Sequence, residues 1–364
     1  MARVIAVYLP QFHPIPENDK WWGKGFTEWT NVGKAKPLFK GHYQPRVPAD
    51  LGYYDLRVAE TREAQADLAR EHGVESFCYW HYWFGNGKRL LERPFNEVLS
   101  SGKPDFPFCL GWANHSWHNK QFSKDGDDKL LIEQIYTVED YKAHFAALLP
   151  AFKDTRYTRV DDKPLFFIYA PFDLPDVTEF MAIWQNLAQE NGLKGIHFVG
   201  NTHSIEDIET LKAKGLDAVC VLRMFHVFKK EFSLFQRAYV KAMRVFFKSG
   251  RILDYEFASK YFSGAEDALD YCYPSIFPNW DHSPRSGRSG HILHNSNPKA
   301  FKKHVKEVLK TVKDKPEEHQ LVFIRSWNEW AEGNYIEPDL KFGKQYLIAL
   351  KEALEEAANL TSGI

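Results

Sequence analysis

The sequence predicts one (β/α)8 barrel with elaborated loops after its strands, formed by residues 1–364 as a single domain. Three observations support this prediction. Short β-branched or aromatic runs alternate with longer segments of helical period, which is typical of βαβ units and a parallel sheet. Eight such runs can be counted, and 364 residues is an ordinary length for one barrel with loop insertions. The chain also shows no internal repeat, low-complexity tract or linker that would divide it.

Strands and helices follow one another in a regular order. Strands are expected near residues 3–9, 76–82, 107–112, 165–170, 195–200, 217–222, 270–276 and 321–327. Helices are expected near residues 56–72, 88–101, 138–152, 176–191, 205–214, 298–313 and 343–358. An open doubly wound sheet is the alternative, but it predicts a glycine-rich phosphate loop after the first strand. Residues 10–14 read Pro-Gln-Phe-His-Pro, which favours the barrel.

The composition narrows the classes of partner. Lys and Arg number 47 against 48 Asp and Glu, so no global electrostatic case exists for binding nucleic acid. Aromatic residues make up 15% of the chain and include 11 Trp, and such side chains stack on the apolar faces of sugar rings. Composition alone fits a large aromatic core equally well.

The cysteines and histidines give no sign of a metal or cofactor site. The four cysteines Cys78, Cys109, Cys220 and Cys272 lie far apart in apolar runs without zinc-type spacing, so we expect small buried hydrophobes. The histidines near residues 115–118 also lack diagnostic spacing. The chain starts with a strand-like segment and holds no long apolar stretch, which predicts a cytoplasmic protein, with membrane association left open.

Polar and aromatic side chains gather just after the predicted strands, where catalytic residues of a barrel lie. Flat rings and hydrogen-bonding groups are what a polyhydroxylated ligand needs. The residues expected to bind substrate are His13, Glu28, Trp29, Asn31, Trp80, His81, Trp83, Trp112, Asn114, His115, Tyr169, Asn201, Trp280, Asp281, Trp327, Asn328 and Trp330. Any one of these residues fits a structural role, in which it caps the barrel mouth or hydrogen-bonds loop backbone, better than a role in binding. Their occurrence at seven strand ends nevertheless favours a glycan site. Arg285 would meet an anionic group of the ligand or form a loop salt bridge.

Glu329 and Glu332 are the expected catalytic residues. In a helical turn beyond the eighth strand their side chains would emerge about 5–6 Å apart. Glycoside cleavage needs one protonated and one ionised carboxyl, and repulsion in an aromatic site pushes two pKa values apart. The spacing alone fits a solvated helix face better, but the flanking segments 324–328 and 333–338 favour catalysis.

Residues 223–251 form a basic aromatic insertion between the sixth and seventh strands. Phe and Tyr alternate there with Lys and Arg, mostly at three and four residue steps, which predicts an amphipathic helix. The helix would pack over the barrel or, alternatively, make peripheral contact with a membrane near lipid-linked glycans.

The motifs together resemble the WbsX-like proteins, which are related to glycoside hydrolase family 99 and are often described among polysaccharide or O-antigen biosynthesis proteins. The resemblance spans nearly the whole chain through segments 8–13, 25–32, 41–45, 80–84, 277–281 and 327–332. It implies a (β/α)8 barrel and adds His42 and Gln44, in the segment Gly-His-Tyr-Gln-Pro, to the substrate-binding residues.

The resemblance also implies roles for the glutamate pair. Family 99 hydrolases are retaining endo-acting α-mannosidases whose Asn-Glu-Trp-x-Glu segment looks like residues 328–332. Glu329 would then deprotonate the sugar 2-hydroxyl, whose oxygen attacks the anomeric carbon to form a 1,2-anhydro sugar, and Glu332 would be the general acid and base. WbsX-like proteins commonly read Trp-Ala-Asn-Glu after the third strand, whereas this chain has His115 at the last position, which alters charge and pH response there.

Three functions follow from these observations. The first is a retaining glycoside hydrolase or transglycosylase acting on an α-linked glycan with a free 2-hydroxyl, such as a mannoside. The second is a glycosyltransferase of cell-surface polysaccharide biosynthesis, although the chain lacks a phosphate loop or an Asp-x-Asp motif near a strand end. The third is a non-catalytic glycan-binding barrel, which His115 in place of a carboxylate makes a real alternative. An oligosaccharide or polysaccharide is the expected partner in each case.

Overall fold

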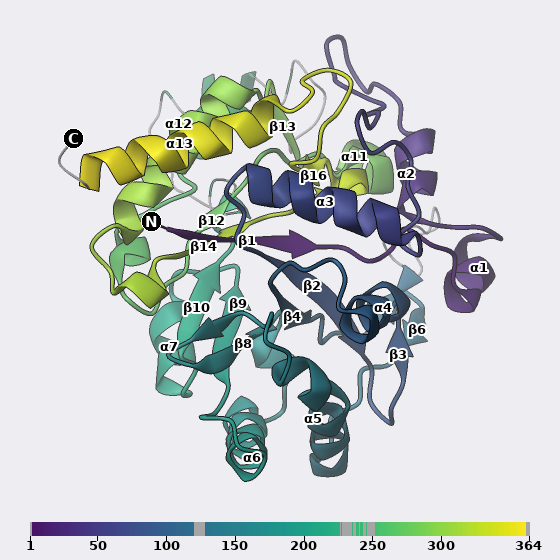
Figure 1. Ribbon diagram of the computed structural model, residues 1–364. Coiled ribbons are helices and arrows are strands. Elements are labelled where there is room, and N and C mark those ends of the chain that lie inside the picture. The colour runs from purple at the N-terminus through teal and green to yellow at the C-terminus, as the bar shows by residue number, and fades with distance from the viewer. Residues whose placement is uncertain are drawn as a thin grey trace.

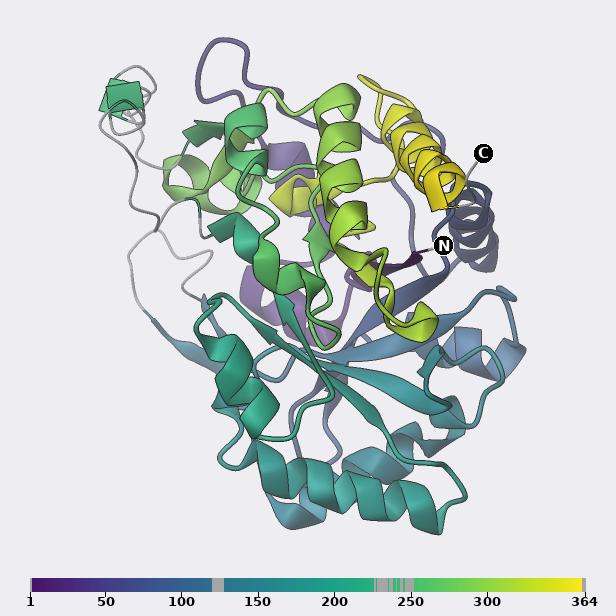
Figure 2. The same cartoon turned by 90° about the vertical axis from the view of Figure 1, so that its left-hand side faces the viewer.

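The protein folds as a barrel of parallel strands surrounded by helices (Figures 1 and 2). The computed structural model describes residues 2–119, 128–225, 227, 235, 238, 239, 241, 242, 245 and 252–361. Eight of the strands are parallel neighbours: β1 Arg3–Tyr8, β2 Ser76–Trp83, β4 Phe108–Trp112, β8 Lys163–Ile168, β9 His197–Thr202, β10 Ala218–Val221, β12 Ser275–Ile276 and β14 Leu321–Ile324. Their order is β10-β9-β8-β4-β2-β1-β14-β12. All eight predicted strands are confirmed.

The two ends of this sheet meet and close the barrel. The amide of Val219 in β10 donates to the carbonyl of Tyr271 at 2.7 Å, and the amide of Tyr273 donates back to Val219 at 2.9 Å. These bonds precede β12, which pairs with β14 through Ser275 and Ile276. An open doubly wound sheet would leave these edges apart, so the barrel prediction is confirmed.

Seven helices lie outside the barrel at the places that the sequence predicts (Figure 2). They are α3 Ala59–Glu71, α4 Arg93–Ser101, α5 Val138–Phe152, α6 Val177–Glu190, α7 Asp207–Ala213, α12 Pro298–Val312 and α13 Gln345–Thr361. Side-chain caps begin two of them: the Asn297 side chain accepts from an amide in the first turn of α12, and Asp176 does the same for α6. Helix α12 packs along α13.

The loops after the strands hold short elements that the sequence does not reveal. The helices are α1 Pro16–Trp22, α2 Glu28–Lys34, α10 Tyr255–Ser259 and α11 Ser283–Ser286. Small strand pairs join β5 Trp117–His118 with β6 Leu130–Ile132, β11 Ile252–Asp254 with β13 Ile292–His294, and β15 Asn328–Glu329 with β16 Asn334–Tyr335. Strands β3 Arg89–Leu90 and β7 Arg159–Val160 add antiparallel edges to β2 and β8. Elements this short show no full hydrophobic period.

The core fills the barrel and the layer between barrel and helices. Strand β2 is buried at every position, which is typical of a parallel barrel strand covered on both faces. The four cysteines are buried and free of disulfides, as their apolar surroundings predict. None of the helices in the described ranges has the length and apolar character that crossing a bilayer requires. Most of the basic aromatic insertion 223–251 lies outside the described residues, so its predicted helix and membrane contact stay predictions.

Candidate active site

A cavity of about 670 Å³ opens at the carboxyl ends of the barrel strands. It is lined by side chains from the ends of β2, β4, β8 and β14 and from the loop that follows β12. Of the residues predicted to act in catalysis or binding, seven line it: Trp80, His115, Tyr169, Trp280, Arg285, Glu329 and Glu332. A cavity of this size accommodates a small glycan.

The two glutamates lie on a tight hairpin rather than on a helix. Glu329 ends β15, and Glu332 ends a 3₁₀ turn that leads into β16. Both glutamates line the same cavity, and a side-chain hydrogen bond links their carboxyls. Gly333 completes the hairpin with φ of 57°, and an added Cβ there would lie 2.7 Å from the Cβ of Asp281. The close pairing expected from the sequence is therefore present on a different local structure.

Arg285 joins two carboxylates at the edge of the cavity. Its Nη1 forms a short ion pair with Glu332, and its Nη2 donates to both carboxylate oxygens of Glu28 at 2.9 Å. Glu28 is fully buried and also accepts the amide of Ala331 at 2.9 Å. His282 Nε2 lies 3.6 Å from the Glu332 carboxylate on the other side. Glu28 thus anchors both the turn that carries Glu332 and the guanidinium that faces this glutamate.

The surroundings shift the pKa values of the two glutamates in opposite directions. Burial, followed by the charge of Glu332, raises the pKa of Glu329, whose carboxylate accepts Trp80 Nε1 at 3.0 Å. Burial also disfavours the charge on Glu332, but Arg285 and His282 outweigh it and lower the pKa of Glu332. The surroundings therefore favour the protonated form of Glu329 and the ionised form of Glu332.

The floor and side wall of the cavity carry a histidine and a second arginine. The His115 ring lies against Tyr169 with centroids 5.2 Å apart, and burial lowers the pKa of His115, which keeps the ring neutral at pH 7. Arg325 donates through Nη2 to Asn201 at 2.5 Å, and its guanidinium lies 5.8 Å from the Trp80 ring centroid. Asn201 thus serves the site by holding Arg325.

Two of the predicted asparagines clasp backbone next to the cavity. The Asn328 side chain accepts the amide of Leu9 at 2.7 Å and donates to its carbonyl at 3.1 Å. Asn114 makes the same double contact with Ala170, at 2.8 Å and 2.7 Å. Each clasp joins the ends of two strands, so these side chains position the loops that carry the site.

Residues 80–83 of strand β2 face two opposite sides of the barrel wall. Side chains alternate along a strand, and Trp80 and Tyr82 face the cavity. His81 instead hydrogen-bonds His144 at 2.9 Å, and Trp83 Nε1 donates to Asp140 at 2.9 Å, both in helix α5. The other predicted residues that lie outside the cavity, buried or packed against the core, are His13, Trp29, Asn31, Trp112, Trp327 and Trp330.

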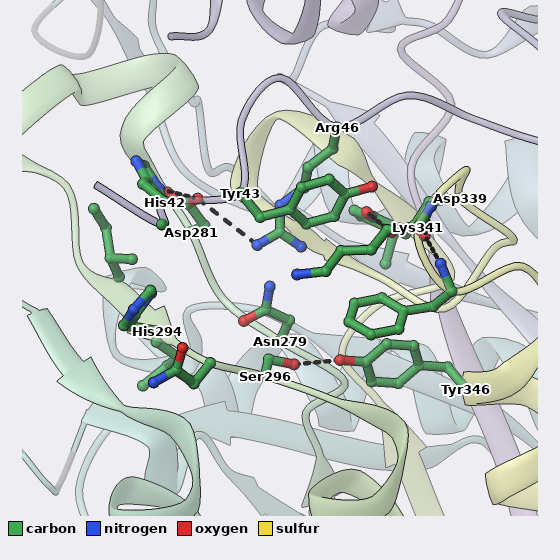
Figure 3. A pocket seen from close by; sticks show the side chains of 16 residues that line it. His42, Tyr43, Arg46, Asn279, Asp281, His294, Ser296, Asp339, Lys341 and Tyr346 are labelled. Carbon is green, nitrogen blue, oxygen red and sulfur yellow. Dashed lines mark hydrogen bonds and ion pairs between the residues drawn. The ribbon is translucent and has the colours of Figure 1, made fainter. Parts of the chain in front are cut away.

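Asp281 holds the turn that carries Glu332, and Figure 3 shows Asp281 beside His42. Its Oδ2 lies 2.8 Å from His42 Nε2 and accepts Gln44 Nε2 at 2.7 Å. Its own amide donates to the carbonyl of Glu332 at 2.6 Å. Burial opposes ionisation, yet His42 and then Arg46 lower the pKa of Asp281 to about 2. The predicted residues His42, Gln44 and Asp281 thus form a buried support for the turn that carries Glu332.

Sequence reasoning missed several residues that line the cavity. They include Tyr82, Trp117, His282, Arg325 and Asn334. The alternation of side chains along β2 would have paired Tyr82 with Trp80. His282 directly follows the predicted Asp281, and Arg325 directly follows β14, so strand-end position was the available signal.

Comparisons with known proteins agree with this architecture. The GH99 endo-alpha-mannosidase from Bacteroides thetaiotaomicron in complex with BIS-TRIS-Propane superposes with a TM-score of 0.63 and 15% identity, covering 100% of this chain and 99% of that one. A second structure of that mannosidase superposes with a TM-score of 0.61 and 16% identity, covering 99% of this chain and 98% of that one. These likenesses show a shared (β/α)8 barrel fold.

Two proteins found by sequence are more similar to this chain, at more than twice the identity of these solved structures. A protein named "Uncharacterized protein WxcX" from Xanthomonas campestris pv. campestris is 37% identical over 367 residues, which cover 100% of this chain and 51% of the relative. Its counterpart in a second strain is 36% identical over 377 residues, with the same coverage. The chain thus spans about half the length of the curated relatives it matches. A family model described as "Glycosyltransferase WbsX" matches residues 4–350, and the chain therefore belongs to the WbsX family.

Proposed function

We propose that this protein is a carbohydrate-active enzyme, specifically a retaining glycoside hydrolase or transglycosylase. Its substrate would be an α-linked glycan with a free 2-hydroxyl, such as a mannoside. One observation carries the proposal: Glu329 and Glu332 lie together at the carboxyl end of the barrel, where Arg285 pairs with Glu332 and the Trp80 indole donates to Glu329, so that their pKa values shift in opposite directions. Glycoside cleavage requires this combination of an acid and an anion.

The contacts of the pair, with the Arg285 cation on Glu332 and the Trp80 indole on Glu329, suggest roles that reverse those implied by the family resemblance. Glu329 would donate its proton to the leaving oxygen, and Glu332 would accept the proton of the 2-hydroxyl. The 2-oxygen would then bond to the anomeric carbon as the bond to the leaving group breaks, giving a 1,2-anhydro sugar. Water, deprotonated by Glu329, would open that ring with retention as Glu332 returns its proton to the 2-oxygen; a sugar hydroxyl in place of water would give transglycosylation.

Two variants with two kinds of substrate test both the activity and the roles. Glu329→Gln and Glu332→Gln should each abolish cleavage of an unactivated α-mannoside while leaving glycan binding. Glycosyl fluorides need no protonated leaving group, so an α-mannosyl fluoride should restore turnover to the variant that lacks the acid. Turnover of the fluoride by Glu329→Gln would support Glu329 as the acid. Turnover of the fluoride by Glu332→Gln would instead make Glu332 the acid, as the resemblance to family 99 implies. Full activity of both variants on glycans that the unaltered protein cleaves would refute the assignment of the pair.

Glycosyl transfer from an activated donor is the second candidate, and the description of the family favours it. The two arginines among the described residues of the cavity argue against a nucleotide donor, because Arg285 is already paired with Glu28 and Glu332 and Arg325 already donates to Asn201. Transfer from a nucleotide sugar, with no hydrolysis of any glycan in a panel of α-mannosides, would favour this candidate. Tight glycan binding without turnover of either kind would indicate a non-catalytic barrel.

Membrane contact through residues 223–251 remains part of the proposal, because that segment is basic and aromatic. Flotation with anionic vesicles tests it, and the absence of binding would remove it.

A further inference from the structure

A second cavity, here called the rear cavity, is shown in Figure 3. The two cavities share no lining residue in the described part of the chain. Alternating residues of one extended segment separate them: Trp280 and His282 line the active site, whereas Asn279 and Asp281 line the rear cavity. The rear cavity is further bounded by residues 41–43 and 46, 292–296, and several between 335 and 346.

The rear cavity suits a small ion better than a sugar ring. The space open to the centres of water-sized molecules is about 40 Å³. One water needs at least about 10–15 Å³ on this measure, so the cavity holds a group the size of a few waters. Its walls are polar and aromatic, which requires any occupant to form hydrogen bonds.

Two cations, Arg46 and Lys341, face this space, and no described carboxylate forms a short contact with either of them. Arg46 is only 7% exposed, and its guanidinium reaches the carbonyl of Gly333 at 3.5 Å and Asp281 Oδ2 at 3.7 Å, both long contacts. Its Nε has no hydrogen-bond partner among the described residues. Lys341 Nζ lies 4.6 Å and 4.8 Å from the ring centroids of Tyr43 and Phe342. No described carboxylate lies within 4.0 Å of this ammonium group.

The neighbouring acids are occupied by other donors. Asp339 accepts the Tyr335 hydroxyl at 2.6 Å and the amides of Lys341 and Phe342 at 3.0 Å and 2.7 Å. Asp281 is engaged by the His42 and Gln44 side chains described above. Partial burial and then Arg46 lower the pKa of Lys341, as expected for two cations that repel each other across one space.

Asn279 supplies a third polar group in the middle of the cavity. Its side chain is 4% exposed, and its Oδ1 has no hydrogen-bond partner among the described residues. Figure 3 shows Arg46 and Lys341 pointing toward this amide. Rotation of the amide by half a turn presents Nδ2 at the same place, so Asn279 can donate to an occupant that the two cations attract.

We propose that the rear cavity is a binding site for a small oxyanionic group, a phosphate or carboxylate, held by Arg46, Lys341 and Asn279. An oxyanion would accept charge-assisted hydrogen bonds from both cations and relieve their mutual repulsion. The site is separate from the glycan chemistry proposed above. Asp281 connects the rear cavity with the active site, because its side chain contacts Arg46 and its amide donates to the carbonyl of Glu332.

Titration calorimetry of the full chain with inorganic phosphate, glycerol phosphate and acetate tests this site. Lys341→Met keeps the aliphatic stem between the two rings but removes the charge, and it should weaken anion binding about tenfold or more. Asn279→Asp is nearly isosteric and places a negative charge in the cavity, so it should abolish binding. Lys351→Met, an exposed lysine of α13 outside the cavity, is the matched control and should leave binding unchanged.

Two results would overturn the proposal. One is the absence of any binding of these anions by the unaltered protein at millimolar concentration. The other is binding that survives in Lys341→Met and disappears in Arg285→Met, which would place the anion in the active-site cavity. Because Lys341 is exposed, its variant should fold even if Asn279→Asp does not, and circular dichroism checks both. Tighter binding of glycerol phosphate than of inorganic phosphate would support a phosphate ester as the natural occupant.

Discussion

Arg285→Met would leave the carboxylates of Glu28 and Glu332 without the guanidinium that lies between them. The Arg285 side chain is 13% exposed, that of Glu332 14%, and that of Glu28 0%, so solvent screens these charges weakly. An opposite charge at this range shifts a carboxyl pKa by about 1–3 units. Loss of Arg285 should therefore raise the pKa of Glu332 by about that amount. The change should also cost about 3–5 kcal/mol of folding free energy, because a buried partner is left unpaired.

The direction of the effect on activity follows from the proposed roles. Activity would require ionised Glu332, so it is lost as the pH falls through the pKa of Glu332. A higher pKa moves this acidic limb of the kcat/KM profile upward by about 1–3 units. Arg285 also lowers the pKa of Glu329, so the alkaline limb should move in the same direction.

A pH profile of kcat/KM on an activated α-mannoside, between about pH 3 and 9, measures these shifts. Arg285→Lys is the control: it keeps a positive charge but not the two-pronged contact, so the acidic limb should stay nearer its original position. Circular dichroism verifies that each variant is folded. An acidic limb that does not move in folded Arg285→Met would show that this arginine does not set the protonation of the pair.

Further predictions concern the cavity wall and the catalytic hairpin. His115→Glu adds a negative charge to the cavity that Glu329 also lines, so the alkaline limb of the same profile should move upward; a downward shift would contradict this. Gly333→Ala should destabilise the protein by about 1–3 kcal/mol in urea unfolding, because φ is 57° and an added Cβ meets an atom at 2.7 Å. Gly33→Ala is the control, because Gly33 lies in helix α2 and a Cβ added there has no atom within 4 Å, so it should not destabilise the protein. Equal losses of unfolding free energy in the two variants would refute the argument. Asn328→Ala should cost about 2 kcal/mol through its lost backbone clasp, and an unchanged unfolding midpoint would disprove that role.

The order of strands and helices could be read from the sequence because each long element repeats a local pattern. Helix α12, for example, carries buried Phe301, Val305, Val308 and Val312 at helical spacing between a capping Asn297 and its end. The short helices and strand pairs of the loops could not be read, since elements of two to seven residues depend on tertiary contacts.

The side that each strand residue faces was decided by the tertiary structure. Strand β2 is buried on both faces, so no alternation of polar and apolar residues reveals its phase. Trp80, His81 and Trp83 were therefore all candidates and Tyr82 was missed, although Trp80 and Tyr82 are the two residues of this run that reach the cavity. The partners of His81 and Trp83 belong to helix α5, about 60 positions along the chain.

The sequence by itself determined that two glutamates stand three positions apart beyond the last strand. Which of them holds the proton was decided by contacts between distant segments: Arg285 lies 47 positions from Glu332 and 257 from Glu28. Spacing along a chain brings carboxyls together through local geometry. Their charges depend instead on burial and on cations within a few ångströms, and the closing of the barrel sets both of these.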